Sequence, residues 1–502
     1  MPKDALQRLR EARGKDKLDV LLEAPDPLAA VAAIPPDELY LAVLEIGRDD
    51  AAELVTLATV PQFRHFIDFA CWPRSDEGPH ASDVLVWLRL AREAGGNSDA
   101  ALARYQEKLA GLDLELLMLV LKSGLTVHDL QETEDPDIAD DASIYRTPEG
   151  RYLVEIRNEY PAMKQLLDDL FERDTFGTAR LLEALRWEVP TELEEVARKW
   201  RDGRLRDLGF PGFEEAMSFY ARPAARRAPL VAPSAGTALV APPRALLDAA
   251  LDLLRGEELQ RAEEGVIHAA NSALVANAVK LDDPAEVREQ LVQARATLSL
   301  GLELLSGGEA MEAAQVLATT PVRTIFQTAM GEAYRLQARA RKIAATARLP
   351  QAQSATLLDL PLAEVVDAFT RKRPLFHAPE SRRPRVLLSR AEIARADALL
   401  DEAGATVAIL NELGLSPAVL GPLADAAGLG AAVVRASDAI RALADAQVRG
   451  EPLSLATLSA DPGPRSAPVV QKAHELIRAA TAKLDTPAAA RAGERLQALV
   501  KG

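Results

Sequence analysis

The sequence contains a single cysteine, Cys71, and only six histidines among 502 residues. One cysteine cannot form an intrachain disulfide, and it also excludes a zinc site built mainly from cysteines. The histidines are scattered along the chain without the close spacing that is typical of metal ligands. We therefore expect a protein of the reducing cytoplasm, with no metal centre and no other cofactor.

Aromatic residues are scarce as well, at 4% of the sequence, although 48% of the residues are hydrophobic. The apolar content is mostly alanine and leucine, which favour helices, whereas the residues that favour strands are few. The composition therefore predicts a predominantly all-α fold. A chain of 502 residues is long enough for about two to four domains of ordinary size.

Long apolar runs and positive charge are also lacking. No run reaches the roughly 18 apolar residues of a membrane-spanning helix, and the charged first 17 residues do not resemble a signal peptide. The 59 basic residues face 75 acidic ones, which gives a net charge of −16. Because such a field repels nucleic acid and anionic membranes, we expect another protein as the partner. The oligomeric state stays open.

Motifs for covalent or nucleotide chemistry are missing from the sequence. There is no G-x-S-x-G nucleophile turn and no G-x-x-x-x-G-K-[ST] phosphate-binding loop. Cys71 lies within a helical pattern and is interpreted as a structural residue. The sequence thus favours a protein without catalytic activity.

Short apolar stretches, each ended by proline or glycine, follow one another in the first 142 residues. They end before Pro25, at Pro35-Pro36 and at Gly47, for example. Helices of two to three turns are marginal alone, so neighbours must stack to bury their apolar sides. We predict an irregular array of short helices over residues 1–142.

The first 70 residues resemble the cytosolic helical domain of MgtE-type magnesium transporters. The resemblance rests on the rhythm of the helices and on the sequence from Ile34 to Leu39, IPPDEL. It implies a superhelix of short helices. It does not imply magnesium binding, because no transport channel follows in the chain.

Residues 143–222 are predicted to close the first half with a β-hairpin and capped helices. The strands are Ser143 to Arg146 and Arg151 to Ile156, around a Pro-Glu-Gly turn. Thr191 and Glu194 have the spacing of a capping box at the start of a helix.

The predicted helix after Thr191 has Leu193, Val196 and Trp200 at helical spacing, which predicts a buried stripe. Gly203 and Gly209 are assigned to turns. We interpret the segment as a structural junction or, alternatively, an exposed interface. Its leading residues are Trp200, Arg204, Asp207, Phe210 and Phe213.

The same segment resembles an uncharacterised family of bacterial proteins, a domain of unknown function. The residues that carry the resemblance are Trp200, Gly203 to Leu205, Asp207 to Pro211 and Phe213 to Ala216. Further matches extend it over most of the chain; they are Cys71-Trp72, Leu300 to Glu303, Leu305 to Gly308 and Arg373 to Phe376. The resemblance implies relatives and no known activity.

A stretch rich in proline and alanine, residues 223–243, is predicted to be a linker. The remainder, residues 244–502, has helical periodicity throughout and is predicted to form a helical C-terminal domain.

Two candidate sites lie in this C-terminal domain. Glu264, His268 and Asn271 share one helix face, so a carboxylate could orient a histidine as a base or join it as a metal ligand.

The second candidate is a basic run interrupted by prolines, which suggests an exposed loop with one aromatic residue among its cations. Its residues are Arg371, Lys372, Arg373, Phe376, Arg382, Arg383 and Arg385. Such a loop could bind a phosphate, an acidic protein segment or a nucleic acid, or it could dock on the acidic surface of the protein itself. Our main hypothesis is a helical scaffold or regulator that binds another protein. The enzyme or metal site and the basic loop are the alternatives.

Overall fold

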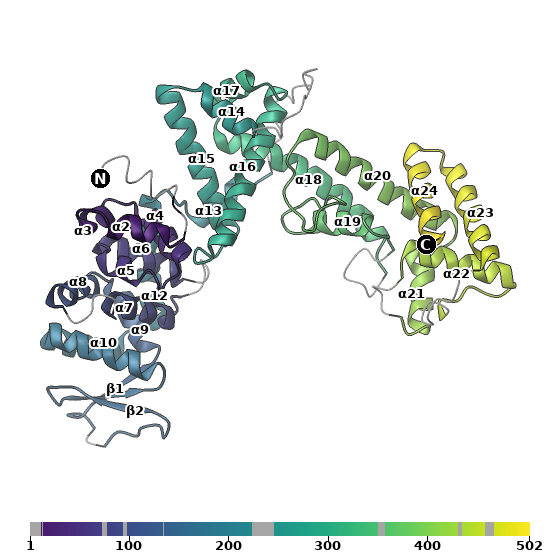
Figure 1. The fold of residues 1–502 in the computed structure, drawn as a ribbon. Helices are drawn as coiled ribbons and strands as arrows, with labels where there is room; N and C mark the ends of the chain where they lie inside the picture. The colour runs from purple at the N-terminus through teal and green to yellow at the C-terminus, as the bar shows by residue number, and fades with distance from the viewer. Residues whose placement is uncertain are drawn as a thin grey trace. The chain divides into compact units, whose positions relative to one another are not determined.

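The computed structural model describes residues 12, 14–72, 78–93, 98–133, 135–222, 245–349, 357–429, 434–456 and 466–501. The predicted linker, 223–243, lies outside these residues. The described residues form 23 helices and one small antiparallel sheet, which confirms the predominantly all-α fold (Figure 1). By its contacts the chain divides into two compact units, Met1–Ser218 with Ala270–Leu291, and Phe219–Ala269 with Val292–Gly502. The domain boundaries predicted at residues 142, 222 and 243 stay predictions.

The first unit begins with the short helices that the sequence predicts. They are α2 (Asp16–Leu22), α3 (Pro27–Ala32), α4 (Pro36–Ile46), α5 (Ala52–Leu57), α6 (Val60–Ala70), α7 (Ala81–Glu93), α8 (Asp99–Ala110) and α9 (Leu114–Lys122). Proline occupies the first turn of α3, α4 and α6, where its missing N–H is not needed. Thr59 and Gln62 form a capping box at α6. Proline therefore sets where these helices begin.

A cluster of aromatic side chains lies in the core of the first unit. Tyr40, Phe66 and Trp87 lie within 6.1 Å of one another, measured between ring centroids. All three are nearly inaccessible to solvent. Cys71 is also buried, and burial raises the pKa of its thiol, which keeps it neutral. Most of the few aromatic residues are thus used for packing.

The sheet has three strands in the order β1-β3-β2, built from β1 (Leu125–Asp129), β2 (Ser143–Arg146) and β3 (Tyr152–Ile156). The predicted hairpin is β2 and β3, and β1 was missed. All five residues of β3 are buried. The buried carboxylate of Glu155 in that strand pairs with Arg157 at 2.8 Å and with His128 at 3.2 Å. Helices α9 and α11 (Thr175–Trp187) pack against β1, and the sheet lies at one end of the unit (Figure 1).

Helix α10 (Tyr160–Arg173) precedes α11, and α12 (Pro190–Asp207) and α13 (Phe213–Phe219) follow it. The predicted capping box at Thr191 is wrong, because the N-cap of α12 is Val189, two residues earlier, and Pro190 is the first helical residue. Glu194 pairs instead with Arg198. Gly203 lies inside α12, whereas Gly209 has a φ of 80° and forms the predicted turn.

From residue 245 onward the described chain is helical with loops. Its helices are α14 (Leu246–Leu253), α15 (Gly256–Ala276), α16 (Pro284–Ser306), α17 (Ala310–Thr319), α18 (Val322–Thr346), α19 (Leu362–Thr370), α20 (Arg390–Glu412), α21 (Pro417–Ala426), α22 (Ala436–Arg449), α23 (Ala467–Leu484) and α24 (Pro487–Lys501). Helices α18, α19 and α20 pack on one another, and α20 also packs against α23 and α24. Within the described ranges no single helix is both long and apolar enough to cross a membrane; by length and composition alone, the bent pair α20 and α21 passes the same test.

Candidate functional site

All 22 aromatic side chains of the protein lie in the described residues, and five of them are exposed. The exposed ones occur together in the sequence, between residues 160 and 213. They are Tyr160 at 36% exposure, Phe176 at 82%, Trp187 at 69%, Trp200 at 56% and Phe213 at 49%. Large apolar side chains that gather on a surface mark interaction sites more often than scattered ones do. Residues 176–213 are called the exposed aromatic segment below.

The exposed apolar residues of this segment have a regular spacing on two helices. Phe176 and Trp187 are eleven residues apart on α11, which is close to three full helical turns, so they share one side of the helix. Val196 and Trp200 share one side of α12, and the exposed Val189 is the N-cap residue just before that helix. The row on α11 is about 16 Å long at 1.5 Å per residue, and the row from Val189 to Trp200 is of similar length.

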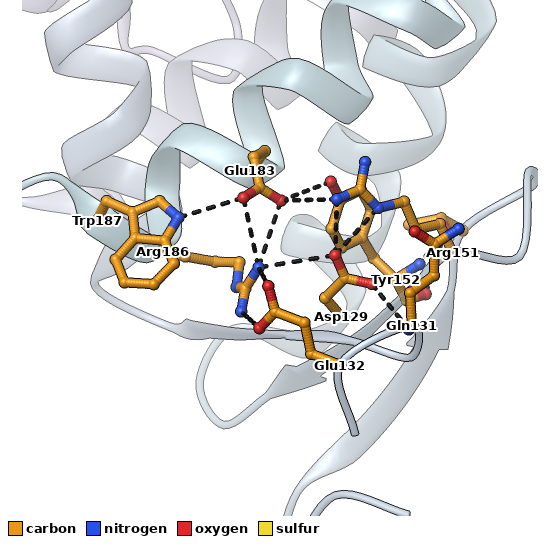
Figure 2. Close-up of polar contacts among 9 residues, drawn as sticks. Asp129, Gln131, Glu132, Arg151, Tyr152, Glu183, Arg186 and Trp187 are labelled. Carbon is orange, nitrogen blue, oxygen red and sulfur yellow. Dashed lines mark hydrogen bonds and ion pairs between the residues drawn. The ribbon is translucent and has the colours of Figure 1, made fainter. Parts of the chain in front are cut away.

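Trp187 is held in place although most of its surface is exposed. Its indole N–H donates to Glu183 Oε1 at 3.2 Å, one turn earlier on α11. The Arg186 guanidinium carbon lies 5.2 Å from the centroid of its ring, a cation–π contact (Figure 2). A side chain fixed before binding loses little entropy when a partner covers it.

A polar network behind Trp187 fixes Glu183 in turn. Tyr152 donates its hydroxyl to Glu183 Oε2 at 2.7 Å, and Arg151 Nη2 lies 3.3 Å from the same oxygen (Figure 2). Arg151 also donates to Asp129 at 2.6 Å and 3.0 Å. The strands β1 and β3 therefore position the side chains that orient the tryptophan of α11.

The titratable side chains of this network keep fixed protonation states around neutral pH. The Tyr152 hydroxyl and the Trp187 indole keep the pKa of Glu183 below its usual range, and the Arg151 guanidinium does the same for the pKa of Asp129. Burial, and then the Glu183 carboxylate, raise the pKa of Tyr152. None of these shifts brings a group towards neutral pH, where a general acid or base works best.

The predicted junction residues divide between the interior and the surface. Arg204 is mostly buried and bridges Asp68 on α6 and Asp113 before α9, each at 2.7 Å. Although burial opposes its charge, these two carboxylates raise the pKa of Arg204. Phe210 is buried and its ring lies 5.7 Å from that of Phe69. Both side chains pack within the first unit, and their role as a structural junction stays a prediction.

Trp200, Asp207 and Phe213 lie on the surface instead. The buried stripe predicted through Leu193, Val196 and Trp200 is therefore wrong beyond Leu193. The buried residues of α12 are Leu193, Ala197, Arg201 and Leu205. Both sets have helical spacing and share Leu193, and the packing of α12 on α9 and α6 decides between them.

The three residues of the predicted enzyme or metal site on α15 each have their own contact. Glu264 accepts from Gln260 at 2.9 Å. The ring of His268 meets that of Phe219 edge-on, with 5.5 Å between centroids. Asn271 donates to the carbonyl of Gly209 at 3.0 Å. Among the described residues no group of three or more histidine, cysteine, aspartate or glutamate side chains could hold a metal ion.

The predicted basic loop is less exposed than its sequence suggests. Phe376 and Arg385 exchange two backbone hydrogen bonds, which pair the two arms of the loop. Phe376 is buried against Phe369, and Arg385 pairs with Glu392 at 2.6 Å.

Arg373 in the same loop lies over the Tyr220 ring at 4.3 Å. Four cations of the loop remain at the surface; they are Arg371, Lys372, Arg382 and Arg383. Binding of a phosphate there stays a prediction.

Phe176, Trp187 and Glu183 were missed by the sequence reasoning. The sequence holds a signal for the two aromatic residues, because Phe176 and Trp187 are eleven residues apart and share one side of α11 with Arg180 and Glu183 between them. An aromatic residue on the charged side of an amphipathic helix is expected to be exposed. The sequence did not show that Glu183 is held by strands 30 residues away.

The fold and this surface define a predominantly helical protein with one small sheet that supports an exposed, oriented tryptophan. The chain belongs to the Family of unknown function (DUF6178), whose model matches residues 1–484. This confirms the resemblance to an uncharacterised family over most of the chain, and it gives no support to the resemblance to MgtE-type transporters. No curated protein and no solved structure matches the sequence.

Proposed function

We propose that this protein acts by binding another protein, as a scaffold or regulator, through the exposed aromatic segment. The observation that carries the proposal is that four of the five exposed aromatic side chains lie in this segment, at Phe176, Trp187, Trp200 and Phe213. Tryptophan and tyrosine dominate the binding energy of protein interfaces, because they bury a large area with few rotatable bonds.

The orientation of Trp187 supports the same proposal. The hydrogen bond to Glu183 and the guanidinium over the ring hold the exposed indole in one conformation. A binding residue gains affinity from both, because its conformation is selected before the partner arrives. The ionised and fully paired side chains behind it favour a binding role over catalysis.

A photo-crosslinking amino acid at Val196 in the full-length chain tests the proposal. Val196 is 39% exposed and lies one turn from Trp200. In cells that naturally produce the protein, we expect a discrete crosslinked species that is lost when Trp187→Ala and Trp200→Ala are added.

The matched control places the crosslinker at Met311, which is 69% exposed in the second unit. This control should not give the same species. Crosslinking at Val196 that persists unchanged in the double tryptophan variant would show that the exposed aromatic segment is not the interface.

A further inference from the structure

The part of the exposed aromatic segment on and around α12 is acidic at its surface. Between residues 188 and 207, four acidic side chains are exposed against two basic ones, Lys199 and Arg206. The acids are Glu188, Glu192, Glu195 and Asp207. The apolar row on α12 therefore runs through a surface of excess negative charge.

The excess of exposed acids over exposed cations arises because several arginines of this segment pair with other groups of the protein. Arg186 pairs with Glu132 and Glu183, and Arg198 pairs with Glu194. Arg201 donates to the carbonyl of Asp68, and Arg204 is held by Asp68 and Asp113.

These four guanidinium groups are committed to the protein's own carboxylates and carbonyls. Between residues 188 and 207 the exposed side chains are therefore four acids and two cations. A partner with positive charge would complement these exposed carboxylates.

Resting on the proposed function, we infer that the partner of the exposed aromatic segment is a basic amphipathic helix. Its apolar side would cover the row of Val189, Val196 and Trp200, whose length of about 16 Å matches three helical turns. Its lysine or arginine side chains would meet Glu188 and Glu195, and the exposed indole ring of Trp200 is a further acceptor for a cation.

The test uses the full-length protein and three synthetic peptides of about 18 residues, long enough for five helical turns. The first carries leucine and lysine in a helical amphipathic pattern. The second replaces each lysine by glutamate, and the third replaces each leucine by serine. Binding is measured by fluorescence anisotropy of a labelled peptide at low and high salt.

We expect the leucine–lysine peptide to bind, and both other peptides to bind at least about tenfold more weakly. Trp200→Ala, and separately Glu188→Lys with Glu195→Lys, should each weaken binding of the first peptide by about tenfold or more. Glu263→Lys with Glu494→Lys is the matched control. It changes the net charge equally at exposed positions of α15 and α24 and should leave the affinity nearly unchanged.

Equal weakening by the two charge-reversal pairs would mean general attraction to an acidic protein and would overturn the inference. Preference for the glutamate peptide, with binding still lost in Trp200→Ala, would also overturn it while leaving the proposed function intact. If all three peptides bind with affinities that Trp187→Ala and Trp200→Ala do not change, and no crosslinked species forms at Val196, both the inference and the proposed function are wrong.

Discussion

The indole N–H of Trp187 donates to Glu183 at 3.2 Å, and Glu183 also accepts from Tyr152 at 2.7 Å. One carboxylate thus connects an exposed tryptophan on α11 to a buried tyrosine of the central strand. Through Tyr152 and Glu183, the small sheet thus helps to orient a side chain at the surface.

Glu183→Gln should loosen Trp187 without unfolding the protein. The amide keeps the shape but loses the charge that strengthens the indole and phenol hydrogen bonds. In spectra of the four indole N–H groups, we expect the Trp187 resonance, assigned with Trp187→Phe, to shift and to exchange faster with water. The three other indole signals serve as internal controls, and an unmoved Trp187 signal would contradict the role given to Glu183.

Trp200→Ala should change the free energy of unfolding by no more than about 0.5 kcal/mol, because the side chain is 56% exposed. Leu205→Ala on the buried side of the same helix should cost about 2 to 5 kcal/mol. Urea denaturation of both variants measures the difference. A large loss in Trp200→Ala would place the tryptophan in the core and restore the buried stripe expected from the sequence.

Arg204→Ala should destabilise the protein by about 3 to 5 kcal/mol, because it leaves Asp68 buried without its cation. Arg204→Lys should recover only part of this loss, since an ammonium cannot contact both carboxylates through a planar fork. Arg206→Ala, at an exposed position two residues later, is the control and should lie within about 0.5 kcal/mol of the wild type. Similar losses for the two alanine variants would argue against the bridge.

Lys108 makes stability depend on pH. Its side chain is buried, its Nζ donates to the carbonyl of Thr56 at 2.8 Å, and burial lowers its pKa from 10.5 to about 8. Below pH 8 both folded and unfolded chains hold the proton, and the folded state carries the cost of a buried ammonium. Between pH 8 and 10.5 the unfolded chain binds more protons, so stability rises with pH.

The stability of the wild type minus that of Lys108→Met should therefore grow by up to about 3 kcal/mol from pH 8 to 10.5, the size of the pKa shift in energy. Denaturation of both proteins at a series of pH values measures this difference and cancels the titration of other groups. A constant difference across the window would show that Lys108 keeps its ordinary pKa.

Gly301→Ala and Gly203→Ala should have opposite effects although both glycines lie inside helices. A Cβ at Gly301 would collide with the backbone carbonyl of Ile325 in α18, so we expect a loss of about 1 to 3 kcal/mol. A Cβ at Gly203 would meet nothing within 4 Å, so alanine should stabilise α12 by about 0.5 to 1 kcal/mol. Thermal unfolding compares them, and equal shifts would disprove the close approach of α16 and α18.

Much of the architecture was predictable from local patterns. Proline and glycine mark the ends of α2 to α6, and alternation of apolar residues marks β2 and β3, because both signals act within a few residues. The strand β1 was missed because it follows α9 directly and pairs with β3, about 27 residues away. Its five residues carry no signal that separates them from a loop.

The candidate site was only partly predictable for the same reason. Sequence alone determined a predominantly helical, acidic chain and singled out the segment around α12, in which Arg204 pairs with two carboxylates and Phe210 is buried. Only the tertiary structure decided which side of α12 is buried, because two helical stripes share Leu193 and α9 and α6 cover just one of them. The remaining stripe, with Trp200 on it, is left at the surface, and Trp187 is oriented by strands that lie far from it in the sequence.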